Sequence, residues 1–213
     1  LKPHFICNAM DMLRLQAQHY QQDQLAESIL QINQYFRYSM LDSGGSASLG
    51  DEIDNAVNYM RLVNVMREDK ILLNVALDAW AEQHASTAML PKMLLQPLLE
   101  NAIQHGFIKD KPLHLTVSFS QQFAEGMLCI RVVNDGKPID PQRQEELNAY
   151  LAQPQPASAG QGVGLSNIRR RLMLFYGECV SLRVASDVNC TSVTILLPIT
   201  KEKGQSVHEG TDR

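Results

Sequence analysis

Two kinds of hydrophobic pattern follow one another along this chain, and their order limits its possible folds. Up to residue 66 apolar residues recur at helical spacing, as in the stripe of Leu25, Ile29, Ile32, Phe36 and Met40. After residue 71, β-like runs alternate with helical ones. This order indicates an α+β fold, in which an N-terminal helical segment precedes an α/β sandwich with one helical layer on one sheet.

The patterns divide the chain into three parts. We expect a helical region over 1–70, the sandwich over 71–200 and a polar, disordered tail over 201–213. Within the sandwich, strands are predicted over 71–77, 113–119, 127–133, 180–185 and 192–198, and helices over 91–105, 141–151 and 163–176. Pro97 either kinks the first of these helices or marks its true first turn, and Gly106 is placed to end it.

Charge and cysteine spacing exclude several classes of protein. With 19 Lys and Arg against 23 Asp and Glu, the net charge is −4, which argues against a broad nucleic-acid surface. The 4 cysteines form no Cys-x-x-Cys pair, so we expect reduced thiols in a cytoplasmic segment. No apolar run approaches the ~18 residues of a membrane span. Because the chain begins at Leu1, we expect it to be a fragment.

A glycine-rich loop, Gly160-Gln161-Gly162-Val163-Gly164-Leu165, opens a predicted helix. Glycines allow the loop amides to turn toward one point, and the helix N-terminus adds positive potential, so the loop can hold phosphate oxygens. It is neither a Walker loop, since no Gly-Lys-Ser/Thr follows, nor a dinucleotide fingerprint, since no strand directly precedes it. A flexible linker before a core helix is the alternative.

A second cluster of polar residues lies near a predicted helix end. Asn101 and His105 are four residues apart and share one face, with Glu100 beside them. The amide oxygen of Asn101 is a suitable ligand for Mg²⁺, Glu100 can orient a water or accept a proton, and His105 can contact a phosphate. Alternatively, all three face solvent and the helix dipole favours His105 there.

Two further segments are candidates for chemistry. The turn Asn134-Asp135-Gly136 follows a predicted strand and can present an acceptor to the exocyclic amine of adenine, or it is an ordinary turn. His4 shares a helical stripe with Asn8 and Asp11. As a nucleophile His4 would need a neutral imidazole, whose tautomer Asn8 can fix. A structural or simply exposed histidine is the alternative.

Three blocks in this order resemble the LytS-type sensor histidine kinases. They are Leu1-Lys2-Pro3-His4-Phe5 with Asn8, then Leu95-Gln96-Pro97-Leu98-Leu99-Glu100-Asn101-Ala102-Ile103-Gln104-His105-Gly106, then Gly160-x-Gly162-x-Gly164-Leu165-x-Asn167-Ile168-Arg169-x-Arg171-Leu172. The similarity extends from Leu1 to about Pro198. It implies a Bergerat-type ATP-binding domain behind a helical dimerisation and phosphoacceptor segment.

The resemblance also implies roles for individual residues. His4 would accept the phosphoryl group beside Asn8, Asn101 would hold Mg²⁺, and Glu100 and His105 would line the phosphate side. The second glycine box would comprise Gly162, Gly164 and Leu165, at the base of an ATP lid over 140–160. The adenine turn would be Asn134, Asp135 and Gly136.

The implied activity is ATP-dependent autophosphorylation, followed by transfer to an aspartate of a response regulator. The implied assembly is a homodimer formed through the stripe at 25–40. No nucleic acid is expected as a partner. Contact with the bacterial inner membrane would come through a segment absent from this chain.

The chain departs from the family pattern at the adenine turn and in the first helix. The family usually has Asp-Asn-Gly-x-Gly, whereas Asn134 stands at the aspartate and Pro138 at the second glycine. Asn134 lacks the charge that strengthens a bond to adenine. Asp11 stands where the family commonly has Asn, which leaves Asp11 and Glu100 as candidate bases. The alternatives are a catalytically degenerate dimeric scaffold, and an ATPase or serine kinase of the same superfamily with His4 idle.

Overall fold

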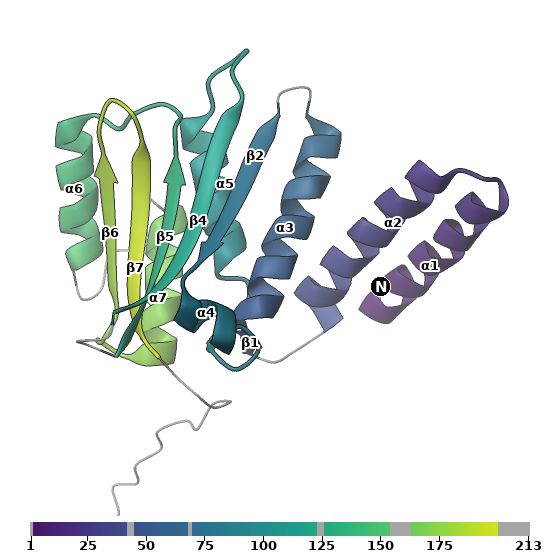
Figure 1. Ribbon diagram of the computed structural model, residues 1–213, viewed down its shortest axis with the longest axis horizontal. Helices are drawn as coiled ribbons and strands as arrows, with labels where there is room; N and C mark the ends of the chain where they lie inside the picture. The colour runs from purple at the N-terminus through teal and green to yellow at the C-terminus, as the bar shows by residue number, and fades with distance from the viewer. Residues whose placement is uncertain (1, 42–44, 68–69, 123–125, 154–162, 200–213) are drawn as a thin grey trace, which may run out of the picture.

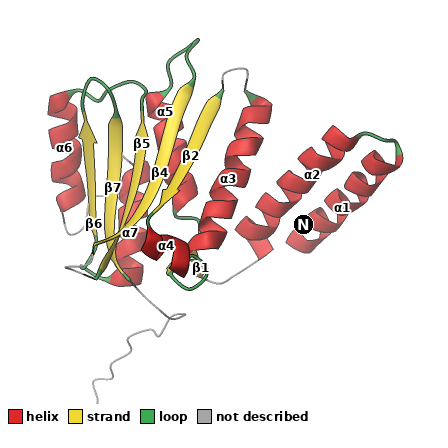
Figure 2. Cartoon of the chain, viewed as in Figure 1, coloured by secondary structure: helices red, strands yellow, loops and turns green. Residues whose placement is uncertain are grey.

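The computed structural model describes residues 2–41, 45–67, 70–122, 126–153 and 163–199 (Figure 1, Figure 2). Its helices are α1 (Pro3–His19), α2 (Asp23–Phe36), the π-helix η1 (Arg37–Leu41), α3 (Leu49–Met66), α4 (Ala79–His84), α5 (Leu95–Gly106), α6 (Pro141–Ala152) and α7 (Val163–Tyr176). Its strands are β1 (Ser46–Ser48), β2 (Ile71–Leu77), β3 (Met89–Pro91), β4 (Leu113–Gln122), β5 (Met127–Asn134), β6 (Ser181–Ser186) and β7 (Thr191–Pro198). The tail predicted over 201–213 lies outside the described residues. None of the described helices combines the length and apolarity that a bilayer crossing requires.

Helices α1 and α2 form an antiparallel hairpin that extends away from the sheet (Figure 1). The sequence leaves open whether residues 16–24 continue one helix, and the structure places a turn there, with Gln21 at a φ of 56°. The small side chains of Ala17 and Ala26 are buried, whereas Leu25 of the predicted apolar stripe is 50% exposed and Met40 is 54% exposed. The stripe is therefore available on the described surface of the hairpin.

Helix α3 begins at a capping box and packs against the sandwich. The Ser48 hydroxyl accepts a hydrogen bond from the Asp51 amide, and the Asp51 carboxylate accepts one from the Ser48 amide. The helix contacts α5 and β2. Five of its buried residues form a stripe at helical spacing: Leu49, Glu52, Ala56, Met60 and Val63. The boundary near residue 70 between the predicted helical region and the predicted sandwich stays a prediction. Helix α3 precedes it in sequence but packs into the core of the sandwich.

The five-stranded sheet has the order β2-β4-β5-β7-β6, with β2 parallel to β4 and the other pairs antiparallel. Along β4, Leu113, Leu115, Val117 and Phe119 are buried and the alternate residues are at least partly exposed. Helices α5 and α7 lie together behind the sheet in Figure 1. The predicted sandwich with one helical layer is therefore confirmed, and its predicted strands form two hairpins, β4 with β5 and β6 with β7.

The predicted helix over 91–105 is wrong at its beginning. Residues 89–91 form β3, which pairs antiparallel with β1 so that Ser46 lies opposite Pro91. Met93 then adopts a φ of 61°, and α5 begins at Leu95 with Pro97 in its first turn. The pairing partner of β3 lies far away in sequence, so local periodicity could not reveal the strand. The short helix α4, capped by Asp78, is also absent from the sequence prediction.

A buried carboxylate from α3 caps helix α5. Leu94, at the N-cap of α5, provides no capping side chain. Instead, Glu52, which is fully buried, accepts hydrogen bonds from the amides of Met93 at 2.5 Å, Leu94 at 2.7 Å and Leu95 at 3.0 Å. The Tyr38 hydroxyl also bonds to Glu52. Burial and this bond raise the pKa of Tyr38 above its usual value, so the phenol stays a donor.

We expect Glu52→Ala to lower the free energy of unfolding by about 3 kcal/mol, because three amides lose their acceptor in a buried site. The measurement is denaturant unfolding followed by circular dichroism. Glu145→Ala, at an exposed position of α6, is the matched control and should change stability by less than about 0.5 kcal/mol. Equal stabilities of the two variants would contradict a capping role for Glu52.

Candidate functional site

The start of α7 meets the middle of α5, and the turn after β5 meets its C-terminal end. The turn after β5 lies so close to this end that a Cβ atom on Gly136 would sit 1.8 Å from the Gly106 carbonyl oxygen. The Lys137 amide donates to that same oxygen at 2.8 Å. Glycine at 136 is therefore required by the close approach of two backbones.

Asn134 fills the space between the turn and the helix end. The side chain is buried, and its Oδ1 accepts a hydrogen bond from the Gly136 amide at 3.1 Å. A Cβ on Gly106 would lie 2.5 Å from this oxygen. The amide oxygen of Asn134 therefore faces the end of α5.

The start of α7 meets the middle of α5 through Gly164 and Asn101. A Cβ on Gly164 would lie 2.6 Å from Oδ1 of Asn101. The Nδ2 of Asn101 donates to the Pro97 carbonyl at 2.7 Å, so the amide is held in one orientation. Leu165, the next residue of α7, is buried in the core. Gly162 lies outside the described residues, as do residues 154–160 of the predicted lid, whereas α6 covers most of the rest.

The side-chain oxygen of Asn101 is a suitable ligand for a magnesium ion whose other ligands come mainly from phosphate. The amide nitrogen is engaged with Pro97, which leaves Oδ1 as the ligand atom, and the missing Cβ of Gly164 leaves space beside it. Within the part of the chain that the structure describes, no three His, Cys, Asp or Glu side chains gather into a metal site. Mg²⁺ commonly takes few protein ligands and completes its shell with water and phosphate oxygens.

Asp135 points to a different partner from Asn134. Its carboxylate accepts hydrogen bonds from the His114 amide at 2.8 Å and from the His114 ring at 2.6 Å. Burial opposes ionisation of Asp135, but these bonds outweigh it and lower the pKa of the carboxyl. Asp135 and Gly136 line a cavity of about 300 Å³ beside Gly106 and Lys111. The sequence contained no signal for the pairing with His114.

Glu100 is exposed, and its carboxylate accepts a hydrogen bond from Gln96 at 2.7 Å. Burial, followed by the charge of Glu100, raises the pKa of Tyr59 to about 12. His105 is exposed in the last turn of α5, where the helix dipole favours a basic side chain.

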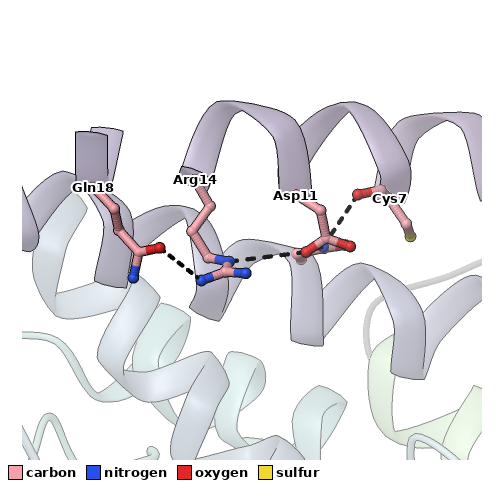
Figure 3. Close-up of polar contacts among 5 residues, drawn as sticks. Cys7, Asp11, Arg14 and Gln18 are labelled. Atoms are coloured by element: carbon pink, nitrogen blue, oxygen red, sulfur yellow. Dashed lines mark hydrogen bonds and ion pairs between the residues drawn. The ribbon is translucent and has the colours of Figure 1, made fainter. Parts of the chain in front are cut away.

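The structure does not bring His4 to Asn101. His4 and Asn8 are exposed on α1, and α2 and α3 separate α1 from α5 (Figure 1). Further along α1, Asp11 lies 4.0 Å from Arg14, which donates to Gln18 at 3.3 Å (Figure 3). The predicted site residues therefore form two groups, one on the hairpin and one on the sandwich.

Sequence reasoning missed two polar side chains that link these groups, Glu52 and Gln96. Glu52 does carry a signal, because it occupies an otherwise apolar stripe of α3. A carboxylate at such a position needs buried donors. Gln96 lies within the block that carries the family resemblance, but its partner Tyr35 is 61 residues away.

Two family models match successive parts of the chain. Residues 1–71 match the model described as histidine kinase. Residues 87–201 match the model described as histidine kinase-, DNA gyrase B-, and HSP90-like ATPase. The second match covers the whole cluster around Asn101, Asn134 and Gly164.

Curated relatives show the same likeness. The sensor histidine kinase YesM of Bacillus subtilis is 26% identical over 203 residues, which cover 95% of this chain and 32% of that protein. The sensor protein LytS of Bacillus anthracis is 26% identical over 199 residues, covering 93% of this chain and 32% of that protein. The predicted resemblance is thereby confirmed. The chain spans about a third of the length of the curated relatives it matches.

Solved structures show the fold. The catalytic domain of the histidine kinase ThkA superposes with a TM-score of 0.53 at 18% identity, over 74% of this chain and 97% of that domain. The match supports the assignment of the sandwich to the architecture of kinase ATP-binding domains.

Proposed function

Because the chain belongs to the histidine kinase-, DNA gyrase B- and HSP90-like ATPase family, we propose that it is the kinase core of a sensor histidine kinase. It phosphorylates His4 with ATP and passes the phosphoryl group to an aspartate of a response regulator. The observation that carries the proposal is that α5 contacts Gly164 through Asn101 and contacts Asn134 through Gly106, in a chain whose N-terminal segment matches the histidine kinase model. The full-length protein would be anchored in the membrane by a segment outside this chain.

The sandwich binds and orients the nucleotide in this proposal. Asn134 accepts from the adenine amine, and the N-terminus of α7 with the loop before it donates to phosphate oxygens. Asn101 Oδ1 holds Mg²⁺, which when bound neutralises charge on the phosphates. His105 contacts the phosphates from the last turn of α5. Gly164 keeps the space beside Asn101 open.

His4 supplies the nucleophile. A lone pair of the neutral imidazole attacks the γ-phosphorus while the bond to the bridging oxygen of ADP breaks. The proton of the ring passes to a carboxylate, for which we propose Glu100, because Asp11 accepts from Asn33 at 2.9 Å inside the hairpin. Asn8 fixes the tautomer of the imidazole. Since α1 lies away from α5, transfer requires the hairpin to move or His4 to come from a second copy (Figure 1).

The second copy is a proposed homodimer partner. Exposed apolar side chains gather on the hairpin: Phe5, Met12, Leu13, Leu15, Leu25, Ile32 and Met40. Exposed apolar residues on paired helices are typical of a surface that packs against another helical pair. Dimer formation would bury this stripe in a four-helix arrangement.

The test of the proposal is incubation of the protein with γ-labelled ATP and Mg²⁺, followed by acid and base treatment. Phosphohistidine is lost in acid and survives base, whereas phosphoserine is lost in base. Acid-labile label that maps to His4 supports the proposal, and base-labile label would identify a serine kinase. Absence of nucleotide binding would instead favour a scaffold, an alternative that Asn134 and Pro138 in the adenine turn keep open.

We expect Asn101→Ala to weaken Mg-ATP binding about tenfold or more, because the amide oxygen that holds the cation is lost. Isothermal titration calorimetry with a nonhydrolysable ATP analogue, with and without Mg²⁺, measures the effect. Asn74→Ala, at an exposed position of β2, is the matched control. An equal affinity of Asn101→Ala and wild type in Mg²⁺ would contradict the metal role.

A further inference from the structure

We propose that Tyr35 and Gln96 are positioning residues that orient Glu100 and make its orientation depend on the helical hairpin. The inference rests on the proposed function, in which Glu100 accepts the proton of His4. Through these residues, the position of α2 would influence the orientation of Glu100 in the ATP-binding part of the molecule.

The contacts run from the hairpin to the carboxylate without a gap. Gln96 Nε2 donates to the Tyr35 hydroxyl oxygen at 2.8 Å and to Glu100 Oε1 at 2.7 Å. Tyr35 belongs to α2, whereas Gln96 and Glu100 lie one turn apart on α5. One amide group therefore holds both the hairpin and the carboxylate that neighbours Asn101.

Gln96 is placed for orientation and contributes little to stability. The residue is 7% exposed, and its Oε1 is buried without a hydrogen-bond partner among the described residues. A buried oxygen without a partner costs free energy. The amide nitrogen donates to both Tyr35 and Glu100, and these two bonds fix the direction in which the amide group points. An apolar residue of similar size at 96 would therefore preserve the fold while releasing Glu100.

Tyr59 of α3 lies near the same carboxylate, since burial and then the charge of Glu100 raise the pKa of its phenol. Its ring lies 6.2 Å from the Tyr35 ring. Tyr59 and Gln96 approach Glu100 from elements of the sandwich core, so the contact that varies with the hairpin is the one made by Tyr35.

Two further contacts hold α2 and η1 against α3. Asn58 of α3 donates to the Gln31 carbonyl of α2 at 2.9 Å, and Tyr38 of η1 bonds to Glu52. These contacts place Tyr35 opposite Gln96 in the conformation described. A displacement of α2 would break the Tyr35 contact and leave Gln96 free to rotate away from Glu100.

The experiment compares Tyr35→Phe, Gln96→Leu, Glu100→Gln and the double variant Tyr35→Phe/Glu100→Gln with wild type in the full chain. The maximal rate of phosphohistidine formation is measured at saturating ATP, and the half-saturating ATP concentration separately. We expect Gln96→Leu to lower the maximal rate about tenfold and Tyr35→Phe about fivefold, with half-saturation changed less than about twofold. Tyr20→Phe, an exposed tyrosine of the hairpin turn, is the matched control.

The double variant separates positioning from general structural damage. If Tyr35 acts through Glu100, the Tyr35→Phe substitution lowers the rate no further once Glu100 is replaced. Independent, multiplicative losses would overturn the inference, as would unchanged maximal rates in Tyr35→Phe and Gln96→Leu. A wild-type protein that forms no phosphohistidine would overturn the proposed function itself, and that outcome is visible before any variant is measured.

Discussion

The His4→Ala variant is expected to incorporate no phosphoryl group from γ-labelled ATP, a loss of at least about a hundredfold relative to wild type. Alanine has no lone pair with which to attack the γ-phosphorus. The affinity for Mg-ATP should stay within about twofold, because His4 is exposed on α1 and the predicted nucleotide contacts lie on α5, β5 and α7. Quantitative labelling and calorimetry on the same preparation measure both effects.

His19→Ala is the matched control for this experiment. His19 is also exposed, at the other end of α1, and should label like wild type. Label that survives in His4→Ala would refute the assignment of the acceptor. Loss of label together with loss of ATP binding would point to a folding defect, which thermal unfolding of the variant would detect.

Replacing Gly136 with alanine should give the largest loss of stability in the sandwich, about 3 kcal/mol or more. The added Cβ would lie 1.8 Å from the Gly106 carbonyl oxygen and 2.4 Å from its carbonyl carbon. These are backbone atoms, so a rotamer change cannot relieve the overlap, and either the turn or the end of α5 must move. Because Asn134 lies in the same place, the affinity for ATP should fall as well.

Denaturant unfolding of Gly136→Ala measures this loss of stability. Gly45→Ala is its control, since a Cβ at Gly45 meets no atom within 4 Å. Gly45→Ala is expected to remain within about 0.5 kcal/mol of wild type. A Gly136→Ala protein as stable as this control would show that the turn does not approach α5 as described.

Local patterns predicted most of the fold because helices and strands have different hydrophobic periods. The strands of both hairpins and the helices α6 and α7 lie close to their predicted bounds. The failure at β3 has a physical cause, since a three-residue strand contains too few residues for a period and exists through its pairing with β1. Pro91, the first residue of the predicted helix, belongs to that strand.

The candidate site could be predicted in part. Asn101, Asn134 and Gly164 stand in recognisable local patterns, and the structure places Gly164 beside Asn101 and Asn134 beside Gly106, at two points of α5. Their roles toward ATP and Mg²⁺ stay predictions, as do those of His4, Asn8, Glu100 and His105. The pairing of Asp135 with His114 had no local signal, because the two residues meet through the register of β4 and β5.

Residue order alone was sufficient to establish the N-terminal helical region, the sandwich that follows it and the family, because periodicity, turn residues and motif spacing act over short stretches of chain. The three-dimensional arrangement decided that Glu52 caps α5, that Gly136 touches Gly106 and that Gln96 joins Tyr35 to Glu100. The first and last of these contacts join residues 42 and 61 positions apart. Such contacts depend on how helices and strands pack, and packing places side chains together that no nearby neighbour in the chain can specify.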